Sequence, residues 1–515
     1  MIQTLQEQYL QAISSNQLYI RNREQWQYLL ESYMGGIDYR NAGHLTKYIN
    51  ENAAEYAARL KSTHLENHCQ SVVSTYMSFL FREQPEREFE GLELDPAVED
   101  FLNDADLDGR SLDAFMKEVA IWASVFGHCW ILMVKPNVGA QTKGDELAQG
   151  VRPYVNLITP LTVTDWNWRR NANGRYDLEY LKYIEEGNDS VSTVREWTPT
   201  EIHTWILDHK NRTVMEHIVE PNGVGAIPAM IAYSRKSPVR GIGVSDITDI
   251  ADAQKTIYNL TSEVEQSIRI NGHPALVKTA GAEASAGAGA IIQIEDNMDP
   301  GLKPYILAVS TDTNSIFTAI EHAVAAIDKM ANTGSIRATE SRRMSGVAQQ
   351  QEFELLNAKL SEKADNLELV EESIWQWFAF YQGTTWAGEI EYPRSFNIKD
   401  EANDMEMLYK AKQAATDPVV LRIIDGEILE LLGAEKEYLP FIDPNPQTGR
   451  TYPDGEAIPD SLPAAYKDSS DPSVPEGQNC GNCEYYKPGE QYCFKFDAPV
   501  REVFWCAKWE AKEVE

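Results

Sequence analysis

One apolar seam at helical spacing constrains the fold of this chain more than any other feature. Its members lie three, four or seven positions apart, and Ala364 lies inside the longest step. They are Phe353, Leu356, Leu360, Leu367, Val370, Ile374 and Trp377. This spacing predicts one face of a helix of roughly 35 residues, much longer than the average globular helix. A basic segment with Arg337, Arg342 and Arg343 precedes it, so the sequence predicts a long helix that follows a basic loop.

The charge of the chain limits its partners. Among 515 residues, 46 Lys and Arg face 79 Asp and Glu, a formal net charge of −33. A chain this long is expected to hold more than one domain. A body this acidic does not bind DNA or anionic membranes by general attraction, so any DNA contact is expected to be local. We find neither a secretory signal nor an apolar run of the ~18 residues that a membrane helix needs, so no membrane partner is expected.

The N-terminal half shows helical and then strand patterns. Apolar steps of three and four predict helices over most of 1–90, with Tyr56–Leu80 as one long helix. Alternating apolar residues between Asn/Gly turns predict a small antiparallel sheet over Pro153–Ile231. Cys69 and Cys129 each stand alone in apolar surroundings. They are expected to be packed free thiols.

The next segment has the order helix, compact insert, helix. The first helix is expected to be capped by Ser245 or Asp246 and to end at Asn271–Pro274, where Gly and Pro stop helices. Ala280–Ala290 is an Ala/Gly-rich tract, predicted to be a loop. The strands of the insert and the second helix are predicted at Ile291–Ile294, Tyr305–Val309 and Ser315–Met330.

The C-terminal part predicts further helices, a linker and a cysteine-rich unit. Asn403–Leu432 has helical spacing with a break at Asp417–Pro418, and 440–479 is rich in proline. Four cysteines follow among many aromatic residues: Cys480, Cys483, Cys493 and Cys506. Four thiolates can bind zinc or an iron–sulfur cluster. A zinc ribbon has two close cysteine pairs, whereas here only the first pair is close. This spacing favours a [4Fe-4S] cluster, while zinc, disulfides and free thiols remain open alternatives.

Familiar catalytic and ligand-binding motifs are incomplete. No Walker A lysine loop occurs, and the third glycine of a dinucleotide motif after Gly241 and Gly243 would fall at Asp246. The acidic loop Asp104–Gly109 lacks the final Glu of an EF-hand. His64 and His68 have no third metal ligand placed near them by the sequence. We therefore predict that the chain is not an enzyme.

Over roughly residues 20–435 the chain resembles the portal proteins of tailed bacteriophages. Several short motifs carry this resemblance, and their order matters more than any one of them. They are Tyr56-x3-Arg59-Leu60, Phe126-Gly127-x2-Trp130, Pro153-Tyr-Val-x-Leu-Ile-x-Pro160, Gly243-x-Ser245-Asp246, Asn271-Gly-His-Pro274 and Ser345-Gly-Val-Ala348 with the long helix.

The resemblance implies an α+β, mainly helical portal fold with wing, stem, clip and crown, plus a small Cys-ligated C-terminal domain. The implied parts are a wing (1–241), stem helix 1 (242–272), clip (273–314), stem helix 2 (315–332), tunnel loop (333–346), long kinked helix and wing (347–400), crown (401–439), linker (440–479) and iron–sulfur-like domain (480–515).

The resemblance also implies a function. Portals are homo-oligomers, here expected to be a dodecamer, that conduct double-stranded DNA during packaging and ejection at a capsid vertex. Their partners are the major capsid protein, terminase and head–tail adaptor. The implied location is the virion, and the host cytoplasm during assembly. Arg337, Arg342 and Arg343 would contact the DNA from the tunnel loop.

The C-terminal cysteines are similar to those of high-potential iron–sulfur proteins. The order of Cys480, Cys483, Cys493 and Cys506 and the surrounding aromatics match that family, although the last two spacings are short. The similarity implies that these four residues bind a [4Fe-4S] cluster, with zinc as the alternative. Two rival functions therefore remain: an iron–sulfur electron carrier, and another structural protein of a virion neck or baseplate.

Overall fold

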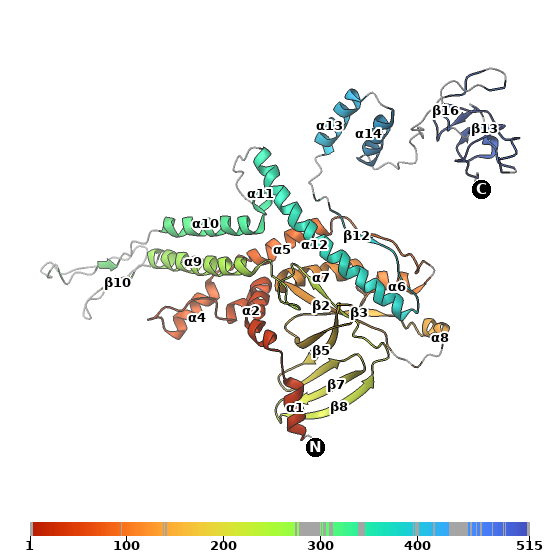
Figure 1. The fold of residues 1–515 in the computed structure, drawn as a ribbon. Coiled ribbons are helices and arrows are strands. Elements are labelled where there is room, and N and C mark those ends of the chain that lie inside the picture. Colours follow the sequence, from red (N-terminus) through yellow and green to blue (C-terminus); the bar gives the residue numbers. More distant parts are fainter. Residues whose placement is uncertain are drawn as a thin grey trace. The chain divides into compact units, whose positions relative to one another are not determined.

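The chain forms two compact units, Met1–Asn397 and Ile398–Glu515, with an α+β composition (Figure 1). The computed structural model describes residues 4–93, 95–136, 139, 142–272, 275–277, 299, 301, 305–307, 313–337, 346–394, 396, 401–415, 418–431, 452–453, 456–459, 461–463, 466–475, 477–487, 489 and 491–511.

Helices make up much of the first unit. They are α1 (Leu5–Ile13), α2 (Gln17–Met34), α3 (Gly36–Asn41), α4 (Ala53–Ser62), α5 (His68–Leu80), α6 (Ala97–Asn103), α7 (Leu112–Phe126), α8 (Lys143–Ala148), α9 (Thr248–Gly272), α10 (Thr313–Ala331), α11 (Gly334–Arg337) and α12 (Gly346–Tyr381). The strands are β1 (Glu86–Arg87), β2 (His128–Val134), β3 (Tyr154–Ile158), β4 (Val163–Arg170), β5 (Tyr176–Gly187), β6 (Val191–Trp197), β7 (Glu201–Asp208), β8 (Thr213–Pro221), β9 (Ala229–Tyr233), β10 (Ala275–Val277), β11 (Tyr305–Leu307) and β12 (Ile390–Glu391).

The predicted long helix is α12, which has 36 residues. Its seam packs into the main core of the first unit, where Leu356, Leu360 and Ile374 are fully buried. Phe353 and Trp377, at the two ends of the seam, are partly buried against the same core. The opposite face of the helix is exposed to solvent, as at Leu369. The apolar spacing therefore predicted both the length of the helix and its buried face.

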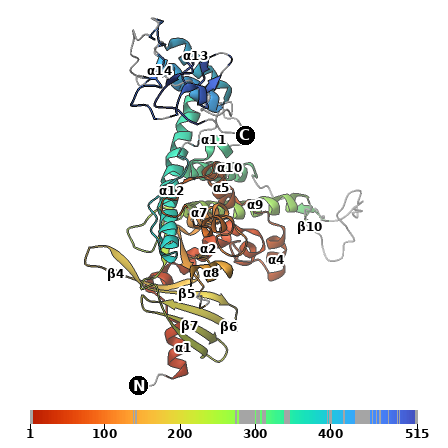
Figure 2. The same cartoon turned by 90° about the vertical axis from the view of Figure 1, so that its right-hand side faces the viewer.

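The predicted antiparallel region contains two sheets. Strands β4 to β8 form a five-stranded antiparallel meander in chain order, and β2 lies between β3 and β9 in a second sheet. Helix α1 lies against the meander in both views (Figure 1, Figure 2), where Tyr9 and Ala12 pack with Trp205 and Leu207. The prediction of an antiparallel sheet is confirmed, but its division into two sheets was not predicted.

Two helix predictions near the N-terminal core are wrong. Tyr56–Leu80 is two helices, because Thr63 ends α4 and the side chain of Asn67 accepts the Gln70 N–H (2.9 Å) to start α5. Helix α9 begins at Thr248, so neither Ser245 nor Asp246 caps it as predicted.

The two glycines before α9 serve packing. A Cβ atom on Gly243 would lie 1.9 Å from the carbonyl oxygen of Gly127, where α7 turns into β2. Gly241 has φ +82°, and a Cβ there would lie 2.5 Å from the indole nitrogen of Trp166. These close approaches leave no room for a side chain at either position, so the two glycines permit a tight turn before α9.

Helices α9 and α10 run side by side and lead to the short hairpin β10–β11 (Figure 1). The predicted end of α9 is confirmed at Gly272, and α10 covers the predicted helix Ser315–Met330. Strand β11 lies within the predicted Tyr305–Val309, but it pairs with β10, which was not predicted. Ala280–Ala290 and Ile291–Ile294 lie outside the described residues.

The second unit contains a helix pair and a cysteine-rich unit. Helices α13 (Glu401–Ala414) and α14 (Pro418–Leu431) match the predicted helical stretch and its break. The remaining elements are β13 (Lys467–Asp468), η3 (Cys480–Asn482), β14 (Tyr486–Lys487), β15 (Tyr492–Cys493), β16 (Ala498–Pro499) and β17 (Phe504–Trp505).

The cysteine-rich unit extends further toward the N-terminus than predicted. Tyr452, Leu462 and Tyr466, from the segment predicted as a linker, are buried in one core cluster with the four cysteines. Strand β13 pairs with β17. Much of 452–475 is therefore part of the packed unit, because its few apolar residues are aromatic or large and cover the cysteine core.

Candidate metal centre

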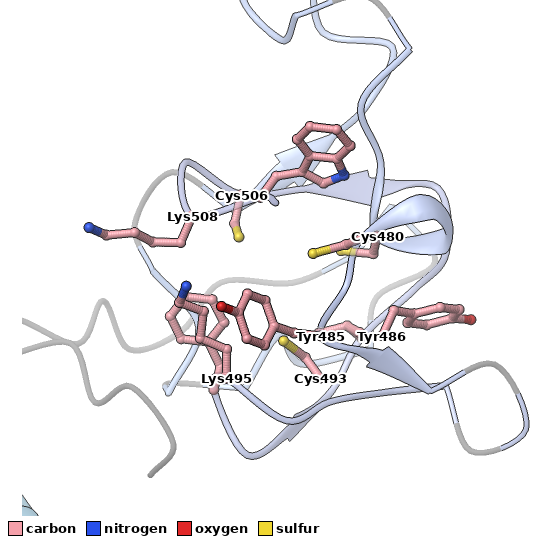
Figure 3. Close-up of a pocket in the computed structure, with 11 residues that line it drawn as sticks. Cys480, Tyr485, Tyr486, Cys493, Lys495, Cys506 and Lys508 are labelled. Atoms are coloured by element: carbon pink, nitrogen blue, oxygen red, sulfur yellow. The ribbon is translucent and has the colours of Figure 1, made fainter. Parts of the chain in front are cut away.

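Four cysteines from different elements line one cavity (Figure 3). Cys480 lies in the 3-10 turn η3 and Cys483 directly follows it; Cys493 ends β15, and Cys506 follows β17. Asn479 and Asn482 fix the turn, since each side chain accepts a hydrogen bond from the other residue's backbone N–H. This arrangement brings the four thiols to one cavity.

All four thiols are free and buried. Tyr485, Tyr486, Phe496, Val500 and Trp509 line the cavity with them. The indole N–H of Trp509 donates to the carbonyl oxygen of Asn479 (2.9 Å), which fixes the ring beside the first cysteine turn. Aromatic and aliphatic walls keep water away from whatever the thiols bind, and this lowers the local dielectric.

Burial disfavours thiolates at this site. It raises the pKa of Cys480, and the neighbouring Cys506, Cys493 and Cys483 raise it further. Burial also raises the pKa of Cys493, and that of Cys506 to about 11. Since a metal binds the thiolate, metal binding here must release protons, and the affinity for metal must fall as pH falls.

Backbone amides partly offset the burial. N–H groups of Lys495 and Phe496 donate to Cys493, and the N–H of Lys508 donates to Cys506; each lowers the pKa of its thiol. Hydrogen bonds to ligand sulfurs are a feature of iron–sulfur sites, where they influence the reduction potential. The loops after Cys493 and Cys506 are therefore shaped to stabilise sulfur that carries negative charge.

Four cysteine thiols suit either zinc or an iron–sulfur cluster. Zinc–sulfur bonds of about 2.3 Å draw four sulfurs close around one ion. Among the described residues, no three His, Cys, Asp or Glu side chains gather closely enough to hold one metal ion.

The predicted DNA-contacting arginines fall in two groups. Arg337, at the end of α11, lies 3.1 Å from Asp328 of α10, and its guanidinium also lies 3.1 Å from Nδ1 of His68 on α5. Its side chain is 13% exposed. Arg342 and Arg343 lie outside the described residues. Among the described residues, Arg337 is thus held against α10 and α5 of the first unit.

A buried ionic cluster went unnoticed in the sequence. Lys363 of α12 forms an ion pair with Asp246 and donates to Ser124 (3.0 Å) and Ser234 (2.6 Å). Lys359, one turn earlier, donates to the Tyr76 hydroxyl (2.8 Å). Two lysines four apart on a helix were the available signal, but their partners lie far away in the chain.

The comparisons with known proteins are weak. No protein-family model and no curated protein matches the chain. Among the helices that the structure describes, none combines the length and apolar character of a membrane span.

Some solved structures do match. A chain in the neck of an empty gene transfer agent particle, computed with C6 symmetry, is 11% identical with a TM-score of 0.44, covering 78% of this chain and 99% of that one. A chain in the virion of a native gene transfer agent particle is 11% identical (TM-score 0.43; 77% and 98% covered). A chain in the native neck computed with C12 symmetry is 12% identical (0.41; 79% and 99%). All three TM-scores lie below 0.5, so this likeness assigns neither fold nor function.

Proposed function

We propose that the chain is the subunit of a portal-like ring that conducts double-stranded DNA into and out of a capsid. The motifs that resemble portals support this, together with the order of elements around them: α9, the β10–β11 hairpin, α10, α11 and the long α12. In this proposal α9 and α10 form the stem, and the segment between α11 and α12 forms the tunnel loop.

The observation that carries the proposal is the apolar surface of the α9–α10 pair. Only Ile327 and Ala331 are buried among the 19 residues of α10. Ile268 of α9 and Phe317 and Met330 of α10 are 59%, 48% and 41% exposed. Leaving such surface in water costs about 25 cal/mol per Å². Neighbouring copies of the chain in a closed ring would cover it on both sides.

The charges fit a conduit. A net charge of −33 repels DNA phosphate, so a duplex would pass an acidic wall without adhering. Arg342 and Arg343 would supply local contacts from the tunnel loop. Arg337 is held by Asp328 and suits an anchor of that loop better than a DNA contact. The proposal includes terminase, the major capsid protein and a head–tail adaptor as partners, location in the virion, and no catalytic activity.

Electron microscopy and native mass spectrometry of the purified full chain test the ring. We expect a closed ring of twelve subunits. The variant Phe317→Asp should remove the ring, because it places a charge on the surface to be covered. The control His322→Asp adds the same charge at an exposed position on another side of α10. A wild-type chain that is stably monomeric or dimeric would overturn the proposal.

A second test addresses the arginines. Arg342→Ala combined with Arg343→Ala should leave rings intact and reduce the DNA content of particles assembled with the variant. Arg337→Ala should instead lower the stability of the first unit, since it leaves Asp328 without this partner. Normal DNA content in the double variant would remove the tunnel-loop role.

We further propose that Cys480, Cys483, Cys493 and Cys506 bind a [4Fe-4S] cluster. The four buried thiols and the N–H groups that face two of them support it. The same observations favour the rival function, an iron–sulfur electron carrier. Metal analysis after anaerobic purification decides the first point, and zinc without iron would overturn the cluster. A redox-active protein that forms no ring would favour the electron carrier.

A further inference from the structure

The two lysines beside the cysteine cavity differ in how they are held. Lys495 and Lys508 both contribute to its wall, whereas Tyr486, Phe496 and Val500 supply apolar atoms. The Lys508 side chain is exposed and extends away from the thiols (Figure 3). The Lys495 amine lies beside Tyr485 in the same view. Of these two lysines, Lys495 is the one whose charge is held beside the cavity.

Two side chains, those of Glu510 and Tyr485, fix the Lys495 charge. Its amine forms an ion pair with Glu510 and lies 4.1 Å from the centre of the Tyr485 ring. The Tyr485 hydroxyl donates to the other oxygen of Glu510 (2.8 Å), which closes the triangle. The Glu510 backbone carbonyl also accepts the Glu484 N–H (3.0 Å), next to Cys483. The Lys495 side chain is 23% exposed, so solvent screens its charge only in part.

Lys495 faces the thiols in two ways. Its side chain lines the cavity that the four cysteines share, and its backbone N–H donates to Cys493. Lys495 thus stabilises negative charge on the sulfurs by two routes. Glu510 opposes the first of them because it is an acid paired to the same amine.

We propose that Lys495 is a positioning residue that raises the reduction potential of the metal cluster, and that Glu510 limits this effect. The inference rests on the proposed [4Fe-4S] cluster. Reduction adds one electron to the cluster and transfers no atom; the electron comes from an external one-electron donor. A fixed positive charge nearby stabilises the more negative, reduced state. Removing the charge must lower the potential, and freeing it from Glu510 must raise the potential.

Spectroelectrochemical titration of the anaerobically purified full chain tests this, with dithionite as reductant and mediator dyes. Lys495→Gln should keep the wild-type iron content and titrate at a lower potential. Glu510→Gln should titrate at a higher potential. Both shifts should shrink at high salt, because the pair is partly exposed. Lys487→Gln is the matched control: an exposed lysine of the same unit that does not line the cavity.

The outcomes separate this inference from the cluster itself. Wild-type protein without iron would overturn both. A full cluster in Lys495→Gln with an unchanged potential would overturn the tuning role alone, as would an equal shift in Lys487→Gln. If Lys495→Gln loses iron, Lys495→Arg decides the matter, because it keeps the charge. A wild-type potential in that variant supports the proposal, and a lowered potential contradicts it.

Discussion

The α12 seam and the cysteine cavity are both buried, but different interactions stabilise them. The seam joins a large apolar core with long helices and sheets whose strands reach 12 residues. Around the cavity, each strand that the structure describes has two residues. Such strands contribute little cooperative hydrogen bonding. The first unit can therefore fold on apolar burial, whereas we expect the cysteine unit to depend on the proposed cluster.

Loss of the metal should give the largest difference between the two regions. Cys480→Ser combined with Cys506→Ser removes two ligands from the proposed cluster. Metal ligation of a small unit can supply on the order of 10 kcal/mol of folding free energy. We expect rapid proteolysis within 452–511 and no change in the proteolysis of the first unit. Limited proteolysis with mass spectrometry measures both. Cys69→Ala, at a buried free thiol of the body, should leave the C-terminal unit protected. Full protection of the double variant would mean that the packing suffices.

The next largest effect should come from a buried charge in the body. Asp246→Asn leaves Lys363 buried without its anion. Breaking such a pair costs about 3–5 kcal/mol, whereas replacing both partners with apolar residues is much milder. We expect urea unfolding of the body, followed by circular dichroism, to show this loss. Asp246→Leu with Lys363→Met should recover part of it; a double variant no better than Asp246→Asn would contradict the explanation.

The same carboxylate predicts a pH dependence. Burial would raise the pKa of Asp246, but Lys363, Lys359 and the hydrogen bonds from Lys363 and Ser234 bring it below its usual value. A depressed folded-state pKa stabilises the protein above the unfolded pKa, about 3.9, and this contribution is lost as pH falls through the folded value. The stability difference between wild type and Asp246→Asn should therefore persist at neutral pH and shrink below about pH 4.

A smaller effect is expected from the seam itself. Leu360→Ala creates a cavity at a fully buried position and should cost about 2–4 kcal/mol in urea unfolding. Leu369→Ala changes the same residue type on the same helix where it is 54% exposed, and should cost less than about 0.5 kcal/mol. Neither variant should alter the iron content. Equal losses in the two variants would mean that the seam is not the buried face in solution.

The sequence predicted local features well and long-range partners poorly. The α12 seam and the end of α9 follow from spacing and from Gly and Pro, which act within a few residues. The partner of Lys363 lies 117 positions away, so no local pattern identifies it. Strand β10 is only three residues long, too short for an alternating pattern.

The candidate metal centre also combines features that the sequence predicted with contacts that it did not. Cysteine type and order predicted a shared cavity, because few other roles need four thiols close together. The mutual contacts of Lys495, Tyr485 and Glu510 could not be predicted, since each residue taken alone resembles an ordinary surface residue. The packing of Tyr452 and Leu462 was also missed, because proline-rich composition indicated a linker and hid these few large residues.

The smallest effect tests where the cysteine unit begins. Arg501 forms an ion pair with Glu456 (2.6 Å) and lies 3.8 Å from the centre of the Tyr452 ring. Glu456 is 72% exposed, so the ion pair should contribute less than about 1 kcal/mol. Arg501→Met loses the ring contact as well and should destabilise the unit more than Glu456→Gln does. Hydrogen exchange of 452–511 measures the stability loss in each variant. Equal losses would show that the contact between Arg501 and the Tyr452 ring adds no stability. A larger loss in Arg501→Met would make this aromatic contact part of the folded unit, because a residue in a free linker could not gain stability from it.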